Sequence, residues 1–379
     1  MDQEKPVIYQ AQKTSLEELR TQYPGVVIID RFDELVEDLF LIRNPKYKFE
    51  KDHSADFEKY KTEYAPKGME KAGNWVYFPW SNTLVKYLPD AEHQELRTAR
   101  NKNIIKAEEQ KKFYELVVGI AGLSVGSHAA LTTVMMGGAR RIRLADPDTI
   151  SGSNFNRIRE DFTVAGQPKI YLASRKIYQM NPYAEVDIFP EGVKEANIDK
   201  FLVGSRKLDI LVEETDFLPM KIMLRLKARE FGIPVVMATD NGDNVIVEVE
   251  RYDLDKKQML FNGAIGEMTM EDFQKMKPED LPKLATKIAG PEYIVTRMQE
   301  SLLEVGRSLY SWPQLGDAAT LSGVVVAYIL RRMAIGEKVR SGKNEVNLDA
   351  IFLEGYDSEE QTNFRETKLK EFLNTIGLN

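Results

Sequence analysis

A glycine-rich turn between an apolar run and a helical pattern is the feature of this sequence that most restricts its fold. The stretch VVGIAGLSVGSHAA begins at Val117, and its glycines would let the backbone turn tightly and approach a ligand. The helix that follows, from about Ser127 to Met136, would direct free N–H groups and its positive dipole end toward a phosphate. The turn therefore predicts a nucleotide site that includes Gly119, Gly122, Ser124 and Gly126.

The spacing of these glycines leaves the type of nucleotide open. A redox enzyme that holds a dinucleotide has Gly-x-Gly-x-x-Gly, whereas this chain reads Gly-Ile-Ala-Gly-Leu-Ser-Val-Gly. Glycines at such a turn also allow plain packing of a strand against a helix. Residues further along the chain must therefore decide between redox chemistry, activation by a triphosphate and a purely structural turn.

Apolar runs alternate with helical patterns after the turn, which predicts an α/β fold: a Rossmann-like, mainly parallel sheet with helices on both faces. We expect strands at Leu116–Gly119, Ile142–Ala145, Glu185–Phe189, Ile210–Val212 and Val235–Ala238. Helices are expected at Ser127–Met136, Lys169–Met180 and Met220–Phe231.

The chain falls into three predicted parts. A short apolar run at Val26–Ile29 and an amphipathic pattern at Phe32–Leu41 indicate a small N-terminal α+β accessory domain over residues 1–90. Residues 91–345 would form the nucleotide-binding domain, and residues 346–379 a C-terminal tail.

Charge and hydropathy argue against several classes of protein. The 379 residues carry a formal net charge of −7, with basic residues scattered among acidic ones, so no single-sign field favours nucleic acid. The longest apolar stretch, around Val324–Leu330, is roughly half of a membrane span. The N-terminal residues show no secretory signal. We therefore expect a cytoplasmic enzyme that binds neither nucleic acid nor a membrane.

The chain contains no cysteine and three histidines, His53, His93 and His128. Structural disulfides, thiolate zinc sites, cysteine nucleophiles and enzyme thioesters are therefore impossible on this chain. The histidines lack metal-ligand spacing, and we expect them to be surface or packing residues. No zinc is expected.

Polar residues that suit a nucleotide follow the turn. Asp146, after the apolar run RIRLA, lies about 20 residues beyond the last glycine, where a carboxylate can accept hydrogen bonds from ribose in redox and adenylating enzymes alike. The loop SGSNFNRIRE and the segment GQPK then supply amide, guanidinium and ammonium groups suited to ribose or phosphate, on Asn154, Asn156, Arg157 and Lys169. Asp216, in LVEETDF, would supply an oxygen ligand for magnesium.

Taken in order, these motifs resemble the ThiF/MoeB family, the bacterial relatives of ubiquitin-activating enzymes. The motifs are the glycine turn, Asp-x-Asp at 146–148, Ser-Asn-x-Asn-Arg, Gly-x-Pro-Lys and Thr-Asp, and the resemblance extends over roughly Arg97–Gly336. It implies an adenylyltransferase that binds ATP and Mg²⁺. A substrate carboxylate would attack the α-phosphate, and pyrophosphate would leave an acyl adenylate.

The resemblance also implies a role for each matching residue. Asp146 would hold the ribose, the triphosphate would contact Asn154, Arg157 and Lys169, and Asp216 would bind magnesium. The nucleotide set as a whole adds Asp148 and Asn156. The segment RTARNK is similar to the family's RYxRQ, so Arg100 would reach into the partner's ATP site of a homodimer. The implied catalytic set is Arg100, Arg157, Lys169 and Asp216.

The chain departs from the family pattern in ways that bear on its substrate. It lacks the paired Cys-x-x-Cys motifs that hold structural zinc in many members, and Phe217 stands where many relatives have Asn. Members without zinc and catalytic cysteine include peptide-modifying enzymes of the microcin C and pantocin type. We therefore expect a carboxylate on a ribosomally made precursor peptide, in antibiotic biosynthesis. The N-terminal domain would bind that peptide, or alternatively serve dimerisation or stability.

Two other functions remain open from the sequence. One is a non-catalytic nucleotide-binding scaffold or pseudoenzyme, and the other, weaker, is an NAD- or FAD-dependent oxidoreductase. Each candidate residue also has a structural alternative: Asp146 and Asp148 could cap a turn, and Arg157 and Lys169 could be solvated surface charges.

Overall fold

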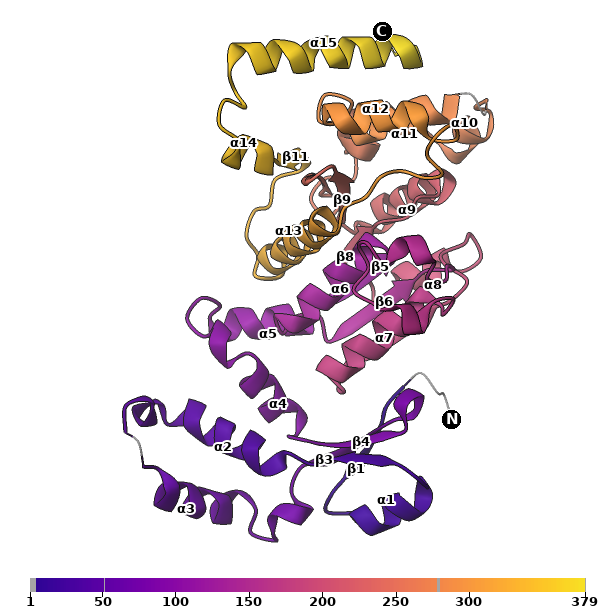
Figure 1. Cartoon of the computed structure of the whole chain (residues 1–379). Helices are drawn as coiled ribbons and strands as arrows, with labels where there is room; N and C mark the ends of the chain where they lie inside the picture. The colour runs from indigo at the N-terminus through magenta and orange to yellow at the C-terminus, as the bar shows by residue number, and fades with distance from the viewer. Residues whose placement is uncertain (1–4, 51, 278–279, 379) are drawn as a thin grey trace. The chain divides into compact units, whose positions relative to one another are not determined.

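The computed structural model describes residues 5–50, 52–277 and 280–378, which form two compact units (Figure 1). The first unit comprises residues 1–111 and 175–184, and the second comprises residues 112–174 and 185–379. Each unit has its own sheet.

The first unit is built on a four-stranded mixed sheet with strand order β1-β3-β4-β2. β3 pairs antiparallel with β1 and β4, and β2 pairs parallel with β4. Apolar side chains of α2, including Phe32, Val36 and Leu39, are fully buried in its core. Its main elements are β1 (Val7–Gln10), α1 (Leu16–Gln22), β2 (Val27–Ile29), α2 (Phe32–Arg43), α3 (Ser54–Tyr64), β3 (Asn74–Phe78), β4 (Thr83–Tyr87), α4 (Asp90–Arg97) and the first part of α5 (Ala107–Glu115).

The second unit contains a seven-stranded sheet with order β11-β10-β9-β8-β5-β6-β7. The five strands from β9 to β7 in this order are parallel, and the β9–β10 and β10–β11 pairs are antiparallel. This sheet confirms the α/β, mainly parallel fold expected from the sequence. The strands are β5 (Val117–Ala121), β6 (Arg141–Ala145), β7 (Glu185–Phe189), β8 (Ile210–Glu213), β9 (Val235–Asn241), β10 (Asn244–Glu250) and β11 (Gly342–Val346).

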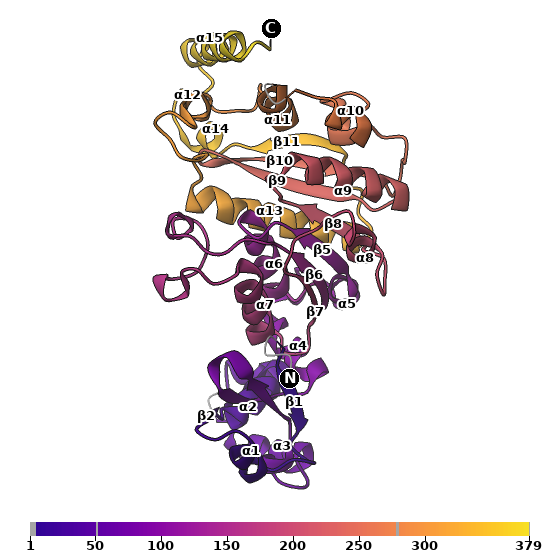
Figure 2. The same cartoon turned by 90° about the vertical axis from the view of Figure 1, so that its right-hand side faces the viewer.

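Helices cover both faces of this sheet. α6 (Val125–Met135) and α13 (Gly316–Ala334) pack against each other, and α9 (Leu218–Phe231) lies on the other side of β9 from α13 (Figure 1). Beyond the β9–β10 hairpin, α10, α11 and α12 lie in a row beside β11 (Figure 2). The other helices are α7 (Lys169–Met180), α8 (Ile198–Leu202), α10 (Met270–Gln274), α11 (Leu281–Ala289), α12 (Thr296–Glu304), α14 (Leu348–Phe352) and α15 (Glu359–Ile376).

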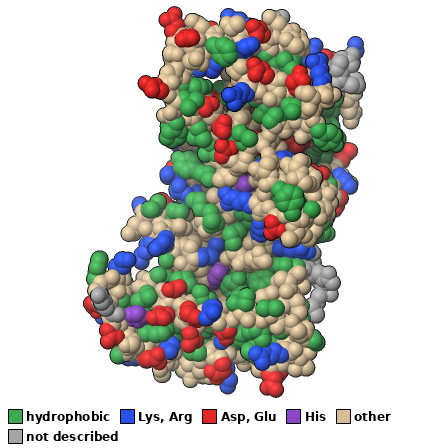
Figure 3. All heavy atoms as spheres, viewed as in Figure 1, with side chains coloured by type: hydrophobic (Ala, Val, Ile, Leu, Met, Phe, Trp, Pro, Cys, Tyr) green, Lys and Arg blue, Asp and Glu red, His purple; other side chains and the backbone are tan. Residues whose placement is uncertain are grey.

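Acidic and basic side chains are interspersed on the face of the molecule that Figure 3 shows. Among the helices of residues 5–50, 52–277 and 280–378, none combines the length and apolar character needed to cross a membrane.

The turn after β5 is the most constrained point of the second unit. Gly122 has φ of +90°, and a Cβ atom there would lie 2.3 Å from the carbonyl oxygen of Glu214. A side chain at this position would therefore meet both an unfavourable backbone conformation and a backbone atom of the strand end beside it.

We predict that Gly122→Ala lowers the free energy of unfolding by about 2 kcal/mol or more, because both penalties apply. The matched control is Gly166→Ala: Gly166 has φ of +81°, but a Cβ there would meet no described atom within 4 Å. The control should cost only about 1 kcal/mol, the backbone penalty alone. Urea unfolding of the two variants measures the difference, and equal costs would contradict the predicted clash.

Candidate functional site

The order of strands in the second unit locates its candidate site. From β5 the chain crosses to β6 on one side, whereas β8, on the other side of β5, leads to β9. Ligands of open parallel sheets bind beyond the carboxyl ends of the strands at such a reversal of direction. The turn after β5, Asp146 after β6 and Asp216 after β8 all lie at this edge.

The three glycines of the turn have different surroundings. Gly122 lies at the edge itself, where its N–H donates to the carbonyl of Ala145 at 2.8 Å. A Cβ atom on Gly119 would lie 2.3 Å from Leu208 Cδ1, and one on Gly126 would lie 2.9 Å from Ile120 Cγ2. Gly119 and Gly126 therefore permit close packing of the strand and of α6, and Gly122 permits the turn.

Asp146 joins this turn to the end of β6. Its side chain is only 4% exposed, and its two oxygens accept from the N–H of Leu123 at 2.6 Å and the N–H of Asp148 at 2.8 Å. Burial raises the pKa of Asp146, and the positive charge of Lys169 opposes that shift. The Asp146 carboxylate thus orders the turn through these two hydrogen bonds. Its contact with a ribose stays a prediction.

Arg157 brings a guanidinium group to the start of α6. Its Nε donates to Ser124 Oγ at 3.2 Å, and its Nη1 donates to the Ser153 carbonyl at 3.1 Å and to Asn156 Oδ1 at 3.0 Å. Burial lowers the pKa of Arg157, while the carboxylates of Asp240 and Asp216 raise it. Ser124 precedes the first residue of α6, so Arg157 adds positive charge to the positive end of that helix.

Lys169 begins α7 and is paired in this structure. Its Nζ lies 2.9 Å from Asp148 Oδ2, and its side chain is 9% exposed, compared with 65% for Asp148. Asn154 is buried in the neighbouring loop, where its Oδ1 accepts from the Ser151 N–H at 3.1 Å. Both partners are local, so Lys169 and Asn154 help to fold the loop between β6 and α7.

Asp216 follows β8 and is exposed. Desolvation by the protein around it raises its pKa, and the positive charges of Lys221, Lys169 and Arg157 oppose the rise. Asp216, Lys169 and Arg157 therefore share one electrostatic environment, although they come from three separate segments.

Arg100 belongs to the first unit, where it is exposed in the short 3₁₀ helix η4 (Ala99–Asn101).

The donor chemistry at Asp216 suits a magnesium ion held together with phosphates. Within the part of the chain that the structure describes, no cluster of three or more His, Asp or Glu side chains could hold a metal ion. Magnesium in nucleotide sites usually has one or two carboxylate ligands, with phosphate oxygens and waters completing its shell. A single exposed carboxylate beside cationic side chains fits that arrangement.

A buried ionic network lies at the end of β8, three residues before Asp216, and the sequence analysis missed it. Glu213 is completely buried and accepts hydrogen bonds from Thr215, from Lys221 Nζ at 2.9 Å and from Arg225. Burial alone would raise the pKa of Glu213, but Lys221 and Arg225 lower it to about 2. Arg225 also pairs with Glu250 at 2.6 Å, and this set of paired charges fixes the end of β8.

Asp240 is a second residue that the sequence analysis missed. It lies near the end of β9, is 8% exposed, and accepts from Ser322 Oγ at 2.9 Å and from Gln314 Nε2 at 3.2 Å. Burial raises the pKa of Asp240 to about 6, while Arg157 opposes the rise. The sequence does carry a signal for it, because Thr239-Asp240 directly follows an apolar run and repeats the Thr-Asp pair of Thr215-Asp216.

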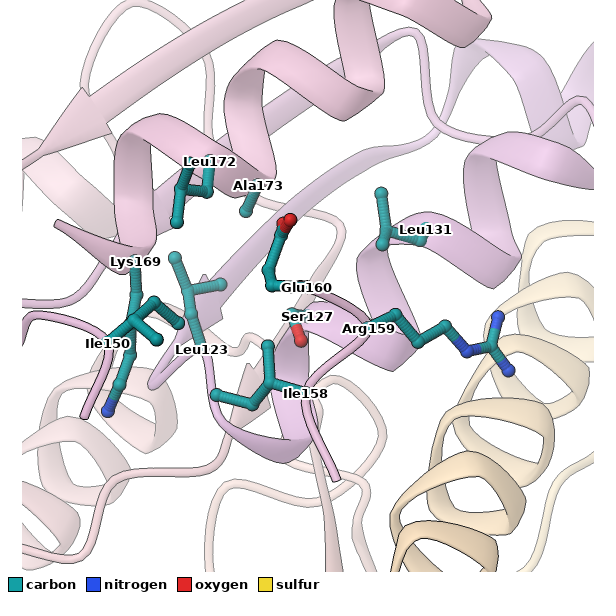
Figure 4. Close-up of a pocket in the computed structure, with 10 residues that line it drawn as sticks. All are labelled: Leu123, Ser127, Leu131, Ile150, Ile158, Arg159, Glu160, Lys169, Leu172 and Ala173. Atoms are coloured by element: carbon teal, nitrogen blue, oxygen red, sulfur yellow. The ribbon is translucent and has the colours of Figure 1, made fainter. Parts of the chain in front are cut away.

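A small hollow lies beside Lys169, between α6, the loop after β6 and the start of α7 (Figure 4). Its lining is mainly apolar, and the charged ends of Arg159 and Lys169 point away from its centre. The residues around it are Leu123, Ser127, Leu131, Ile150, Ile158, Arg159, Glu160, Lys169, Leu172 and Ala173.

Comparison with known proteins gives the family of this part of the chain. Residues 97–249 match the ThiF family. The chain carries a ThiF-family domain. The match begins before β5 and ends within β10, so it contains Asp146, Arg157, Lys169, Asp216 and Asp240. This result confirms the resemblance drawn from the order of the motifs.

Two curated relatives and one solved structure are similar over longer or shorter stretches. Uncharacterized protein MT1398 of Mycobacterium tuberculosis is 34% identical over 285 residues, which cover 75% of this chain and 39% of that protein. The sulfur carrier protein adenylyltransferase of Thermus thermophilus is 27% identical over 133 residues, 34% of this chain and 46% of that protein. A crystal structure of E. coli MccB with MccA-N7isoASN is 13% identical with a TM-score of 0.46, covering 83% of this chain and 84% of that one. The chain thus spans less than half of the length of both curated relatives.

We predict that Asp240→Asn flattens the dependence of stability on pH between about pH 4 and pH 6. In this range the folded protein binds a proton at Asp240 that the unfolded chain does not, since folding raises the pKa to about 6. The free energy of unfolding of the native protein therefore falls as the pH rises. The variant should be more stable by about 2 to 3 kcal/mol at pH 7 and equally stable near pH 4.

Urea unfolding of both proteins at several pH values measures this difference. The same change at the exposed Asp199, which pairs with Lys227 at 3.4 Å, is the control for the altered net charge. A stability difference between Asp240→Asn and the native protein that is constant from pH 4 to pH 7 would contradict the prediction.

Proposed function

We propose that this chain is an ATP-dependent adenylyltransferase that activates a carboxylate through an acyl adenylate. The observation that carries the proposal is the shared environment of Arg157, Lys169 and Asp216 beside the Gly122 turn, at the reversal of chain direction in the sheet. Membership of the ThiF family and the adenylyltransferase named among the relatives support the same activity.

The charges of the site suit attack on a phosphate. A carboxylate and a triphosphate are both anions, so positive groups must offset the charge that gathers around the α-phosphate in the transition state. Arg157 at the start of α6 and Lys169 at the start of α7 would supply hydrogen-bond donors and positive charge, together with the free N–H groups of α6. The attacking carboxylate is already ionised at neutral pH, so no side-chain base is required.

Lys169 would exchange partners when ATP binds. Its pairing with Asp148 keeps the ammonium group in place, and because the Asp148 side chain is 65% exposed, this ion pair contributes little to stability. A phosphate, with more charge than one carboxylate, would compete well for the same donor. Asp216 would hold a magnesium ion, which neutralises charge on the phosphate oxygens when bound.

We further propose that the carboxylate belongs to a ribosomally made peptide and that the acyl group stays off the enzyme. This chain has no cysteine and cannot itself form an enzyme thioester, so the adenylate would react directly with its acceptor. The first unit, with its own sheet and core, is the candidate for holding the remainder of such a peptide. The competing function is a nucleotide-binding scaffold without turnover. Exchange of pyrophosphate into ATP distinguishes them, because only the adenylyltransferase would catalyse it.

We predict that labelled pyrophosphate exchanges into ATP only in the presence of the correct peptide, because the substrate carboxylate and not an enzyme group attacks the α-phosphate. A panel of peptides carrying Asp, Glu or Asn serves as the probe. Asp216→Asn and Lys169→Met should each lower the exchange rate by about 100-fold, since each removes charge stabilisation from the transition state. Lys370→Met, at an exposed position of α15, is the matched control.

Three results would overturn this function. Cleavage of ATP to ADP and phosphate would place the attack on the γ-phosphate. Tight binding of NAD with none of ATP would favour the oxidoreductase instead. Magnesium-dependent ATP binding without exchange for any peptide in the panel would favour the scaffold.

We also propose that the active form is a homodimer whose ATP site takes Arg100 from the partner. Mixing equal amounts of Arg100→Ala and Asp216→Ala subunits should then restore up to about a quarter of the native activity, because about half of the dimers are heterodimers and one of the two composite sites in each heterodimer is intact. Mass spectrometry of the mixture verifies that heterodimers form. Inactive heterodimers, or a protein that is monomeric when active, would contradict the composite site.

A further inference from the structure

We propose that Asp240 is a positioning residue for Arg157, acting through Gln314 and Asn156. The inference rests on the proposed function, because it assigns to these residues the placement of a guanidinium group that would contact ATP. It extends the site to β9 and to the segment before α13, neither of which carries a residue predicted from the sequence.

A continuous set of hydrogen bonds links the four residues. Gln314 Nε2 donates to Asp240 Oδ2 at 3.2 Å, and the Gln314 carbonyl accepts from Asn156 Nδ2 at 2.6 Å. Asn156 Oδ1 in turn accepts from Arg157 Nη1 at 3.0 Å. Gln314 therefore uses its side chain toward β9 and its backbone toward the loop that carries Arg157.

Close packing restricts how far the linked groups can move. A Cβ atom on Gly316, at the start of α13, would lie 2.6 Å from the Asn156 carbonyl oxygen. On the other side, His128 Nε2 lies 2.5 Å from the Arg157 carbonyl oxygen, and a Cβ atom on Gly323 would lie 2.5 Å from His128 Cβ. The backbone of the Arg157 loop is thus held between α6 and α13, which leaves the direction of the guanidinium group to its side-chain contacts.

The chemistry of Asp240 argues for a role beyond packing. The buried Asp240 carboxylate has lost its contacts with water and accepts hydrogen bonds from only two neutral groups, a hydroxyl and an amide. This environment disfavours its ionised form. The positive charge of Arg157 favours the ionised form of Asp240, and the negative charge of Asp240 favours Arg157 in return. An uncharged residue would serve packing better at this position, so the charge serves the guanidinium group.

The inference predicts coupling between substitutions in equilibrium binding of ATP with magnesium. Asp240→Asn keeps an acceptor for Gln314 but removes the charge, and Gln314→Met removes the side-chain donor at similar size. Each should raise the dissociation constant of ATP by about 5-fold, and Arg157→Ala by about 20-fold. Combined with Arg157→Ala, either substitution should add nothing further, because its effect passes through Arg157.

Two controls separate positioning from loss of structure. Ser322→Ala removes the other donor to Asp240 without touching the link to Arg157, and it should change the dissociation constant by less than about 2-fold. Asp240→Asn should lose ATP affinity while its urea midpoint at pH 7 does not fall, a combination that a purely structural residue would not show.

The outcomes distinguish this inference from the proposed function. Binding of ATP by the native chain with independent, multiplicative effects in the double variants would overturn the role of Asp240 and leave the adenylyltransferase intact. Unchanged affinity in both single variants would also overturn it. A native chain that does not bind ATP at all would overturn the proposed function itself.

Discussion

The close approach of the Gly122 turn to the end of β8 is the constraint on which the candidate site depends. With φ of +90° and no side chain, Gly122 lets the chain leave β5 beside the Glu214 carbonyl, which a Cβ atom would approach to 2.3 Å. The N–H of Glu214 bonds the Ala121 carbonyl at 2.7 Å, so the two strand ends are also joined directly. The start of α6, Asp146 and Asp216 meet at one edge because these strand ends are held together.

Carboxylates and cationic side chains are both desolvated at that edge, and each shifts the pKa of the other. Burial raises the pKa values of Asp146, Asp216 and Asp240, and the nearby Lys169 and Arg157 oppose these shifts. The paired charges of Glu213, at the end of β8, and Arg225, in α9, are fully buried and join these two elements. In this structure carboxylates therefore balance the cations of the site, and the proposed function requires the triphosphate to replace some of these carboxylates as partners.

Local sequence pattern predicted much of the fold. The bounds of α7 and β7 agree with the expected Lys169–Met180 and Glu185–Phe189, because the periodicity there is uninterrupted. α6 begins at Val125, two residues before the predicted Ser127, because the helix starts directly after the turn. The antiparallel strands β10 and β11 were not predicted. β10 pairs with β9 across the two-residue turn at 242–243, a local hairpin signal that the sequence analysis did not use. The pairing of β10 with β11 joins residues about a hundred positions apart, and no local pattern encodes such a contact.

The candidate site likewise contains residues that local motifs predicted and residues that only the tertiary structure brings together. Asp146, Arg157, Lys169 and Asp216 stand in ordered motifs near strand and helix ends, which is why sequence could propose them. Asp240 and Gln314 could not be linked to Arg157 from sequence, because the bond between Asn156 and Gln314 joins positions 158 residues apart. Partners of buried charges, such as Lys221 and Arg225 for Glu213, likewise depend on tertiary packing.

Hydrogen–deuterium exchange with and without ATP and magnesium tests the location of the site most directly. We predict slower exchange in peptides that cover residues 122–127, 153–157 and 214–217, because a bound triphosphate would protect the start of α6 and order the loops around it. NAD at the same concentration should produce no such protection. Protection by ATP elsewhere in the chain, or equal protection of these segments by NAD, would contradict a triphosphate site at this edge of the sheet.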